Sequence, residues 1–465
     1  MENEKTQAEL LKEKLFATHK SAYELCDEQE ILKAYDYCGG YMKFLNAAKT
    51  ERECVSEAVK LLDAAGFTPF EYGKSYATGD KFYLNNRGKA LYAVVMGKKS
   101  LEDGLSVAAG HIDSPRIDLK QNPLYEEGGM AFFKTHYYGG IKKFQWVTIP
   151  LALHGVIVKE DGTVINVCIG EDESDPVFYI TDVLPHLGKD IQAKNVSSAF
   201  PAENLNILCG SAPDTSADSD KTKEAVLKLL NQKYGITETD LLTAELSAVP
   251  AGKSRDLGFD RSMILAFGHD DRSSCWPAFR ALMDTPTCQK TCVVAFADKE
   301  EIGSVGITGM RSNFLTDLIT DLCESAGQNP RKALANTAAV SADVAAAFDP
   351  NYAEVFEKRN TAYVNGGVCI CKFTGARGKS GSSEADGGFI AGLCAKFDRD
   401  GVLYQFGELG KVDQGGGGTV AQYLADKNIE VVDIGIPMLS MHAPYEIAGK
   451  ADVYILYKLC KSFFN

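Results

Sequence analysis

The chain has 465 residues, too many for a single small core, and this length predicts two or three domains. It is 45% hydrophobic and 24% charged, as globular proteins are, and its 49 basic and 63 acidic side chains give a net charge of −14. This acidic balance argues against nucleic-acid binding, which draws on Lys and Arg. No apolar run approaches the roughly 18 residues of a membrane-spanning helix, so no membrane role is predicted.

The thirteen cysteines are scattered along the chain and include no CxxC pair. Their odd number, and the apolar surroundings of most of them, predict free buried thiols rather than disulfides or a thiolate zinc site. The start of the chain, residues 1–5, leads into a charged segment and not into the apolar stretch of a signal peptide. Both observations favour a cytoplasmic location.

The first thirty or so residues have the polar character of a surface helix. The next helix is predicted to begin at Thr50, because Thr50 and Glu53 form a capping box and an apolar stripe follows them. Gly66 is suited to end this helix, since glycine readily takes the backbone conformation of a helix C-terminus.

A hairpin is predicted next, from extended runs at residues 81–84 and 90–95 that flank the turn sequence Asn-Asn-Arg-Gly. An apolar run at residues 105–109 then predicts a buried strand that ends at His111. A lone histidine in such a place is more often a core residue than a ligand, so His111 needs support from other residues.

After Pro115 the pattern changes to short strand-like runs joined by polar loops. The runs lie at residues 147–151, 156–159 and 164–169, and a loop rich in Ser, Asp and Thr spans residues 211–221. We interpret residues 116–253 as an inserted, mostly β domain. The flanking segments, residues 1–115 and 254–465, would then form one discontinuous domain.

From about residue 255 onward, predicted strands alternate with predicted helices. The strands lie at residues 263–267, 291–297, 335–341 and 430–436, and helices follow residue 272 and begin near residue 309. This alternation predicts an α/β sandwich. A glycine run at residues 415–418, before a further helix, is interpreted as a turn that lets backbone approach the active site.

Side chains of metal-binding types occur just past the ends of these predicted strands. They are His111 and Asp113, Asp270 and Asp271, Glu300 and Glu301, Asp343, and His442. Taken singly, each has a simpler interpretation as a core histidine, a turn, a helix cap or a loop residue. Together, two histidines and several carboxylates suit Zn²⁺, Mn²⁺ or Co²⁺. Two ions that share one carboxylate would lie roughly 3.5–4 Å apart, as in two-metal hydrolases.

The adjacent carboxylates Glu300 and Glu301 follow the apolar run at residues 292–297. Neighbouring residues at the end of a strand point in different directions. One carboxylate can therefore bind a metal while the other acts as a general base toward a metal-bound water.

These motifs, in this order and spacing, resemble the aspartyl-aminopeptidase family of dinuclear zinc exopeptidases along nearly the whole chain. They are Gly110-His111-Ile112-Asp113-Ser114-Pro115, His269-Asp270-Asp271-Arg272, Asp298-Lys299-Glu300-Glu301-Ile302-Gly303-Ser304, Ser341-Ala342-Asp343 and Ser440-Met441-His442. In the insertion, His136-Tyr137-Tyr138-Gly139-Gly140 and Ile149-Pro150-Leu151-Ala152-Leu153-His154 match as well. The chain departs from the family at Lys299, where His is frequent, and at Asp271, where Asn is common.

The resemblance implies a role for each matching residue. Asp270 would bridge two metals, with a cis peptide after it. His111 and Asp343 would complete one metal site, and Glu301 and His442 the other. Glu300 would be the general base, and Asp113, the second predicted catalytic residue, would orient His111. Lys372 and His154 would bind substrate, His154 in the active site of a neighbouring subunit.

The resemblance also implies the architecture and the activity. Residues 1–115 and 254–465 would form a three-layer α/β/α zinc-exopeptidase sandwich, the catalytic metallopeptidase domain, and residues 116–253 a β-rich domain for dimerisation or lid closure. The implied enzyme is a metal-dependent aminopeptidase that removes N-terminal residues from short peptides with a free N-terminus. It would hold two divalent ions per subunit, Zn²⁺ first and Co²⁺ or Mn²⁺ as alternatives. It would be a homo-oligomer, typically a tetrahedral dodecamer.

Two alternatives stay open at this stage. Carboxypeptidases and N-deacylases share the dinuclear zinc fold but need a cation, for which Arg377 or Lys372 is available, to hold a substrate carboxylate. A non-enzymatic assembly protein with the same fold is the other alternative, although a scaffold has no need of Glu300 beside Glu301. The preferred N-terminal residue also stays open, between acidic and neutral or apolar side chains.

Overall fold

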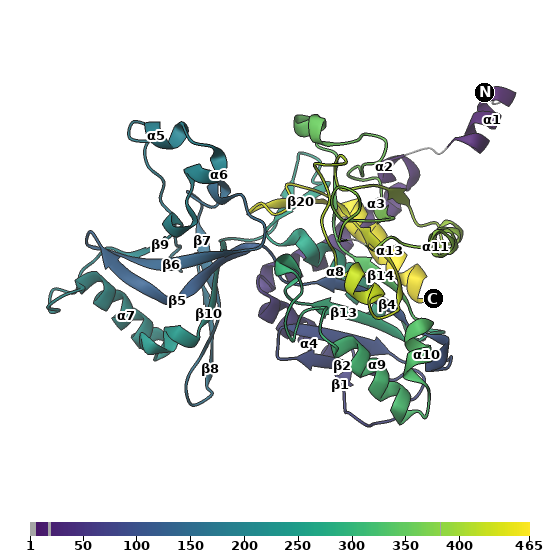
Figure 1. Cartoon of the computed structure of the whole chain (residues 1–465), viewed down its shortest axis with the longest axis horizontal. Helices are drawn as coiled ribbons and strands as arrows, with labels where there is room; N and C mark the ends of the chain where they lie inside the picture. The colour runs from purple at the N-terminus through teal and green to yellow at the C-terminus, as the bar shows by residue number, and fades with distance from the viewer. Residues whose placement is uncertain (1–5, 17–19, 382) are drawn as a thin grey trace.

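A computed structural model describes residues 6–16, 20–381 and 383–465. The charged start predicted for residues 1–5 therefore lies outside the described residues. Two lobes separate clearly in Figure 1, a larger one that contains the described ends of the chain and a smaller one formed by residues between about 116 and 250. In the described ranges, no helix is both long and apolar enough to cross a membrane.

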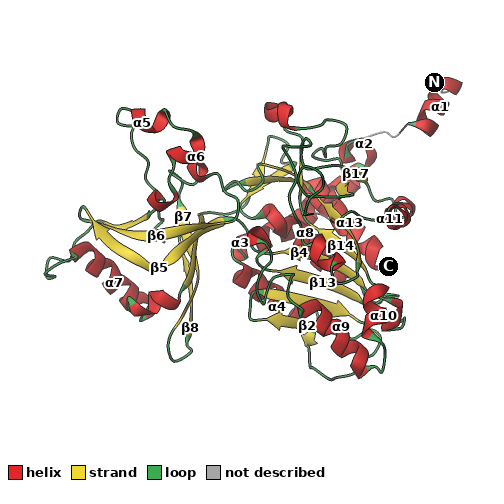
Figure 2. Cartoon of the chain, in the orientation of Figure 1, coloured by secondary structure: helices red, strands yellow, loops and turns green. Residues whose placement is uncertain are grey.

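The larger lobe is built on a mixed sheet, to which the described residues contribute nine strands (Figure 2). In spatial order they are β1 (Thr68–Pro69), β2 (Lys81–Asn86), β3 (Ala90–Val95), β13 (Cys292–Ala297), β4 (Ser106–His111), β14 (Ala338–Ala342), β18 (Glu430–Gly435), β16 (Val368–Cys371) and β17 (Tyr404–Phe406). The four central strands β13, β4, β14 and β18 are parallel to one another. Their carboxyl ends therefore share one edge of the sheet.

Helices cover both faces of this sheet, because alternate strand residues are apolar on each side. In β13, Val294 and Phe296 belong to one core cluster, while Val293 and Ala295 belong to the other. The first cluster is closed by α3 (Glu28–Ala47), α4 (Glu51–Ala64), α8 (His269–Met283), α11 (Gly387–Arg399) and α13 (Lys450–Phe464). The second is closed by α9 (Phe314–Ser325), α10 (Pro330–Ala335) and α12 (Ala421–Ala425). The predicted three-layer α/β/α sandwich is confirmed.

The smaller lobe contains an antiparallel sheet with its own apolar core around the buried Trp146. Its strands, in spatial order, are β8 (Val164–Ile169), β7 (Leu151–Val158), β10 (Glu245–Pro250), β5 (Arg116–Glu127), β6 (Met130–Tyr138) and β9 (Ile207–Gly210). Its helices are α5 (Lys189–Gln192), α6 (Val196–Ala199) and α7 (Lys221–Tyr234). We keep the division at residues 116 and 253 as a proposal.

A third, small sheet lies beside the large one and carries the segments that contain Asp270 and His442. Its strands, in spatial order, are β11 (Arg255–Leu257), β12 (Met263–Ala266), β20 (Glu446–Gly449), β19 (Pro437–Leu439) and β15 (Ala345–Ala346). The chain leaves β12 directly into α8 and leaves β19 directly into the loop that contains His442. Two short helices, α1 (Gln7–Leu15) and α2 (Ala22–Leu25), precede α3 at the described N-terminus.

Several predicted elements are found where the sequence placed them, and others are not. The capping box of Thr50 and Glu53 begins α4, and the hairpin is formed by β2 and β3. The prediction of two separate strands, at residues 147–151 and 156–159, was wrong. The structure has a single strand here, β7, which begins at Leu151. Val147 lies in a loop, and its apolar side chain is buried in the core of the smaller lobe.

Two helix predictions also need correction. The helix predicted from about residue 309 begins only at Phe314, after a loop. The helix α7 was not predicted at all, since residues 116–253 were interpreted as mostly β. Its side chains include few fully buried ones, so the apolar period of this helix is weak in the sequence.

Candidate metal centre

Side chains of the predicted ligand types converge at the carboxyl edge of the large sheet. His111 is the last residue of β4, and Asp343 is the first residue after β14. Glu300 and Glu301 lie in a short helical turn after β13. Because these three strands are parallel neighbours, residues at their carboxyl ends come together, as in other open α/β sheets.

Asp270 and His442 reach the same place from the small sheet. Asp270 lies in the first turn of α8, where its backbone is not helical (φ −77°, ψ 107°), and the Asp270–Asp271 peptide is cis. His442 lies in the loop after β19 with a positive φ of 65°. Pairing of β12 with β20, and of β20 with β19, sets these two loops side by side.

Asp270 lies between the two histidines. Its Oδ1 is 3.1 Å from Nε2 of His111, and its Oδ2 is 3.2 Å from Nε2 of His442. A second carboxylate accompanies each histidine: Asp343 Oδ1 lies 3.9 Å from His111 Nε2, and Glu301 Oε1 lies 3.6 Å from His442 Nε2. Each of these two three-residue groups offers ligand atoms within 4.8 Å of one another. Asp270 belongs to both groups, which is the arrangement of a carboxylate shared by two ions.

The charges at this site fit divalent cations. Burial raises the pKa of Glu301 and of Asp343 well above the usual carboxyl value, and the negative charge of Asp270 raises both pKa values further. Burial also opposes ionisation of Asp270, but hydrogen bonds with His111 and His442 outweigh it and lower its pKa. Buried carboxylates in this number need compensating positive charge, which one or two divalent ions would provide.

Glu300 is the more exposed member of the adjacent pair. Its side chain is 17% exposed, whereas that of Glu301 is 4% exposed. Its Oε2 lies 4.0 Å from Nε2 of His111, and burial raises its pKa to about 7. A carboxylate with this pKa suits a general base at neutral pH. Glu300 also forms a group with His111 and Glu301, and the ligand atoms of these three residues lie within 4.8 Å of one another. By this geometry Glu300 could also bind a metal ion.

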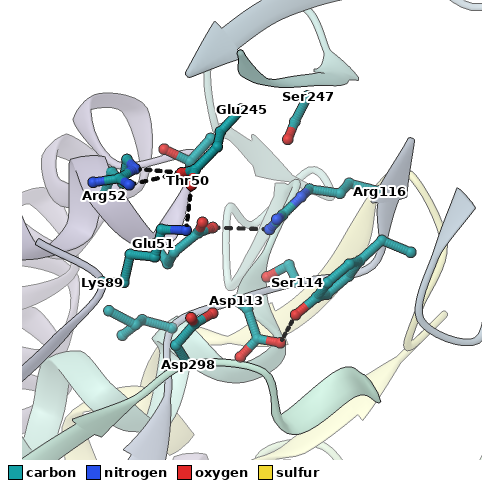
Figure 3. A network of polar contacts seen from close by, with 12 residues as sticks. Thr50, Glu51, Arg52, Lys89, Asp113, Ser114, Arg116, Glu245, Ser247 and Asp298 are labelled. Carbon is teal, nitrogen blue, oxygen red and sulfur yellow. Dashed lines mark hydrogen bonds and ion pairs between the residues drawn. The ribbon is translucent and has the colours of Figure 1, made fainter. Parts of the chain in front are cut away.

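Asp113 lies behind the cluster and is fully buried. Its Oδ1 lies 3.4 Å from Nδ1 of His111, and its carbonyl oxygen lies 2.9 Å from the same nitrogen. The backbone N–H groups of Glu300 and Glu301 each donate to its carboxylate at 3.2 Å. The Tyr138 hydroxyl donates to Asp113 Oδ2 at 2.8 Å, the bond drawn as a dashed line in Figure 3. Asp113 thus fixes both the His111 ring and the turn that carries the two glutamates.

Arg116 connects this arrangement to the smaller lobe. Its guanidinium lies over the Tyr138 ring, 4.3 Å from the ring centroid, and donates to Glu51 at 2.9 Å (Figure 3). It also donates to Asp118 at 2.8 Å. Tyr138 and Arg116 come from the strands β6 and β5, so the smaller lobe helps to hold Asp113 in place.

Glu446 is part of the site although no sequence motif indicated it. Its side chain is buried on β20, where Oε2 accepts the Asp270 N–H at 3.0 Å and Oε1 accepts the His442 N–H at 2.7 Å. One carboxylate therefore fixes the backbone of two candidate ligands that are far apart in the sequence. Burial raises the pKa of Glu446 to about 8.

We expect Glu446→Gln to weaken metal binding by about 10- to 100-fold, the usual effect of losing a partner behind the ligands. An amide has one acceptor oxygen, so one of the two backbone N–H groups loses its partner. Competition titration of the stripped protein against a zinc chelator measures the affinity. Glu430→Gln, on the exposed first residue of β18, is the matched control. Equal affinities of the two variants would show that Glu446 has no part in holding the ligands.

Asp271 explains one departure from the family pattern. It is fully buried next to His111, whose N–H lies 3.4 Å from Asp271 Oδ2, and burial together with the charge of Asp343 raises its pKa well above the usual value. A carboxyl group that keeps its proton has the shape and neutrality of an Asn side chain. Asp271 can therefore occupy the place where the family commonly has Asn.

The cluster opens into a cavity of about 520 Å³. Its remaining lining is formed by Gly140, Gly303, Val344, Ala345, Ala346, Cys371, Phe373, Thr374, Glu408, Leu409, Gly416, Gly417, Gly418, Thr419, Gln422, Tyr423 and Met441. The glycine run at residues 415–418 was interpreted as a turn that brings backbone close to the active site, and Gly416, Gly417 and Gly418 do line the cavity.

Lys372 does not line this cavity, and its role in substrate binding stays a prediction. Its neighbours Cys371 and Phe373 line the cavity, and successive side chains of an extended chain point to opposite sides. The Lys372 side chain is accordingly exposed.

His154 lies where the two lobes meet. It is buried within its own chain, with Nδ1 2.8 Å from Glu53 Oε1 and Nε2 3.0 Å from Glu171 Oε1. Although burial opposes protonation, hydrogen bonds with Cys168, Glu171 and Glu53 raise the pKa of His154 to about 11. Both ring nitrogens are therefore engaged in an ion-pair network between the two lobes, and a role of His154 in a neighbouring active site stays a prediction.

The chain is similar to known proteins along nearly its whole length. The family described as Aminopeptidase I zinc metalloprotease (M18) matches residues 44–464. The “Probable M18 family aminopeptidase 1” of Clostridium acetobutylicum is 46% identical over 460 residues, which cover 97% of this chain and 99% of that protein.

Solved structures of related proteins share the fold. The crystal structure of an M18 aminopeptidase from Thermotoga maritima has a TM-score of 0.92 at 41% identity and covers 97% of this chain and 100% of that one. The mApe1 dodecamer of S. cerevisiae has a TM-score of 0.75 at 22% identity and covers 92% of this chain and 95% of that one. At that identity, the likeness to the yeast protein is one of fold alone.

Proposed function

Since this chain belongs to the M18 family of zinc metalloproteases and is a metallo-aminopeptidase, we propose that the cluster around Asp270 is its active site. One observation carries the proposal: the two oxygens of Asp270 face two different histidines, and each histidine has a further carboxylate beside it. This arrangement provides two ligand sets that share one residue.

Two zinc ions would be held by these sets. His111 and Asp343 would complete one site, Glu301 and His442 the other, and Asp270 would contribute one oxygen to each. When bound, the ions supply Lewis acidity that polarises the scissile carbonyl and lowers the pKa of the attacking water. The nitrogen and oxygen ligands suit Zn²⁺ and also accept Co²⁺ or Mn²⁺.

The protein's own groups would move the protons. Glu300 would take a proton from the attacking water and then give it to the amine of the leaving peptide. Its raised pKa suits both steps, because the group must accept a proton and release it again near neutral pH. Asp113 would hold Glu300 at the right place through the backbone N–H groups of Glu300 and Glu301.

Short peptides with a free N-terminus are the proposed substrates. A cavity of about 520 Å³ accommodates a few residues and not a folded protein. The carboxypeptidase and deacylase alternatives need a cation for the substrate carboxylate, and no Lys or Arg of the described chain lines the cavity. We also propose a homo-oligomer, since the solved yeast mApe1 structure is a dodecamer.

Release of amino acids from matched peptides with free and N-acetylated N-termini tests the function. We expect release only from the free peptides, lost after treatment with a chelator and restored by added Zn²⁺. A blocked N-terminus removes the ammonium group by which an aminopeptidase selects its substrate. Cleavage of the acetylated peptides at comparable rates, or activity that survives complete removal of the metal, would contradict the proposal.

A further inference from the structure

One wall of the active-site cavity contains the carboxylate of Glu408, for which the described residues provide no partner. Three segments build this wall: residues 373–375, 408–409 and 415–418. The Gly375 N–H donates to the Gly417 carbonyl at 2.6 Å, and the Gly416 N–H donates to the Leu409 carbonyl at 3.0 Å. Gly416 has a φ of 104°, and a Cβ there would lie 2.0 Å from the Gly375 oxygen. The wall is therefore closely packed at its backbone, and Glu408 has a defined position in it.

The charge of Glu408 is not balanced by a cation. Within the described ranges, its half-buried carboxylate makes no hydrogen bond and no ion pair. Lys379 lies near the wall, with its ammonium 3.9 Å from the centroid of the Phe373 ring. That ammonium is already paired with Glu384 at 2.7 Å. Apart from Glu408, the charged groups in the lining belong to the metal cluster.

The rest of the lining away from the cluster is mainly apolar or uncharged. Val344, Ala345 and Ala346 follow Asp343 in the sequence, and Phe373, Leu409 and Met441 supply larger apolar surface. An N-terminal side chain that enters this space leaves water for an apolar surface next to one negative charge. An apolar side chain gains from that transfer, whereas an acidic side chain is repelled and loses its hydration.

We propose that Glu408 is a specificity-determining residue that makes this enzyme reject peptides with an acidic N-terminal residue. The enzyme then acts on peptides that begin with an apolar or uncharged residue, and a basic residue is accepted because it can pair with Glu408. This inference rests on the proposed function, since it assumes that the cavity receives the N-terminal side chain.

Three peptides of identical sequence beyond their first residue provide the test. Leu, Asn and Asp at the N-terminus have nearly the same shape and differ in polarity and charge. We expect kcat/KM for the Leu peptide to exceed that for the Asp peptide by about 100-fold or more, with Asn between them. In Glu408→Gln, the ratio of Asp to Leu rates should rise by about tenfold, and raising the salt concentration should raise this ratio in the parent enzyme.

Two further variants make the result specific. Glu324→Gln removes the same charge from an exposed position on α9, and the ratio of Asp to Leu rates should then stay at the parent value. Lys379→Met removes the cation near the wall. Faster release of Asp than of Leu from these peptides by the parent enzyme overturns the inference. If Lys379→Met then loses this preference for Asp, the selection is assigned to Lys379. An unchanged ratio in Glu408→Gln also overturns it. Failure to release any residue from all three peptides would instead contradict the proposed function.

Discussion

Glu300→Gln is expected to slow release of the N-terminal residue by a factor on the order of 10³ while the protein keeps its metal. The amide has nearly the shape of the carboxylate but cannot accept a proton from water at neutral pH. The Glu300 side chain is the more exposed of the adjacent pair, and its Oε2 lies 4.0 Å from Nε2 of His111. It is thus placed beside the cluster and open to the cavity, where water and substrate meet.

Glu301→Gln is the matched comparison, because it makes the same chemical change one residue further along. Glu301 is 4% exposed and lies beside His442, so its loss should reduce metal content as well as turnover. Steady-state kinetics and elemental analysis of the purified variants measure both quantities. Near-normal turnover by Glu300→Gln would remove Glu300 from the role of base. Loss of metal from Glu300→Gln, as from Glu301→Gln, would make it a ligand instead.

The order of strands and helices in the larger lobe follows from local signals in the sequence. The strand that ends at His111 and the strand before Glu300 are mostly apolar in sequence and buried at every residue, which is typical of parallel strands covered on both faces. Ligand-type residues just beyond such strands could be predicted to meet, because parallel strands place their carboxyl ends at one edge. The pairing of His111 with Asp343, and of Glu301 with His442, came from the family resemblance and not from any local pattern.

Glu446 and Tyr138 show what local patterns do not contain. Glu446 looks like an ordinary residue on a short strand, and its function depends on contacts with two backbone N–H groups 176 and 4 residues away. Tyr138 lies in a motif that was noted, but its bond to Asp113 depends on how the smaller lobe packs against the larger one. Lys372 is a third case: its neighbours Cys371 and Phe373 line the cavity, Lys372 does not, and its role in substrate binding stays a prediction.

Asp270→Asn is expected to remove both metal sites together, because Asp270 is the one residue common to the two ligand groups. Asn keeps one oxygen acceptor and presents an NH₂ group to the other histidine, where a cation cannot bind. Replacing an outer partner already costs about 10- to 100-fold in metal affinity, so loss of a shared ligand should cost each ion at least about 100-fold. Turnover should then fall below detection at ordinary zinc concentrations.

Asp343→Asn is the control that separates a shared ligand from a single one. Asp343 accompanies His111 alone, 3.9 Å from its Nε2, and belongs to one of the two groups that contain Asp270. We therefore expect it to lower the zinc content from two ions per chain to about one. Elemental analysis after gel filtration measures the ions retained, and circular dichroism of both stripped variants shows whether they are folded. If Asp270→Asn retains one tightly bound ion, or if the two variants lose metal equally, Asp270 does not bridge two sites.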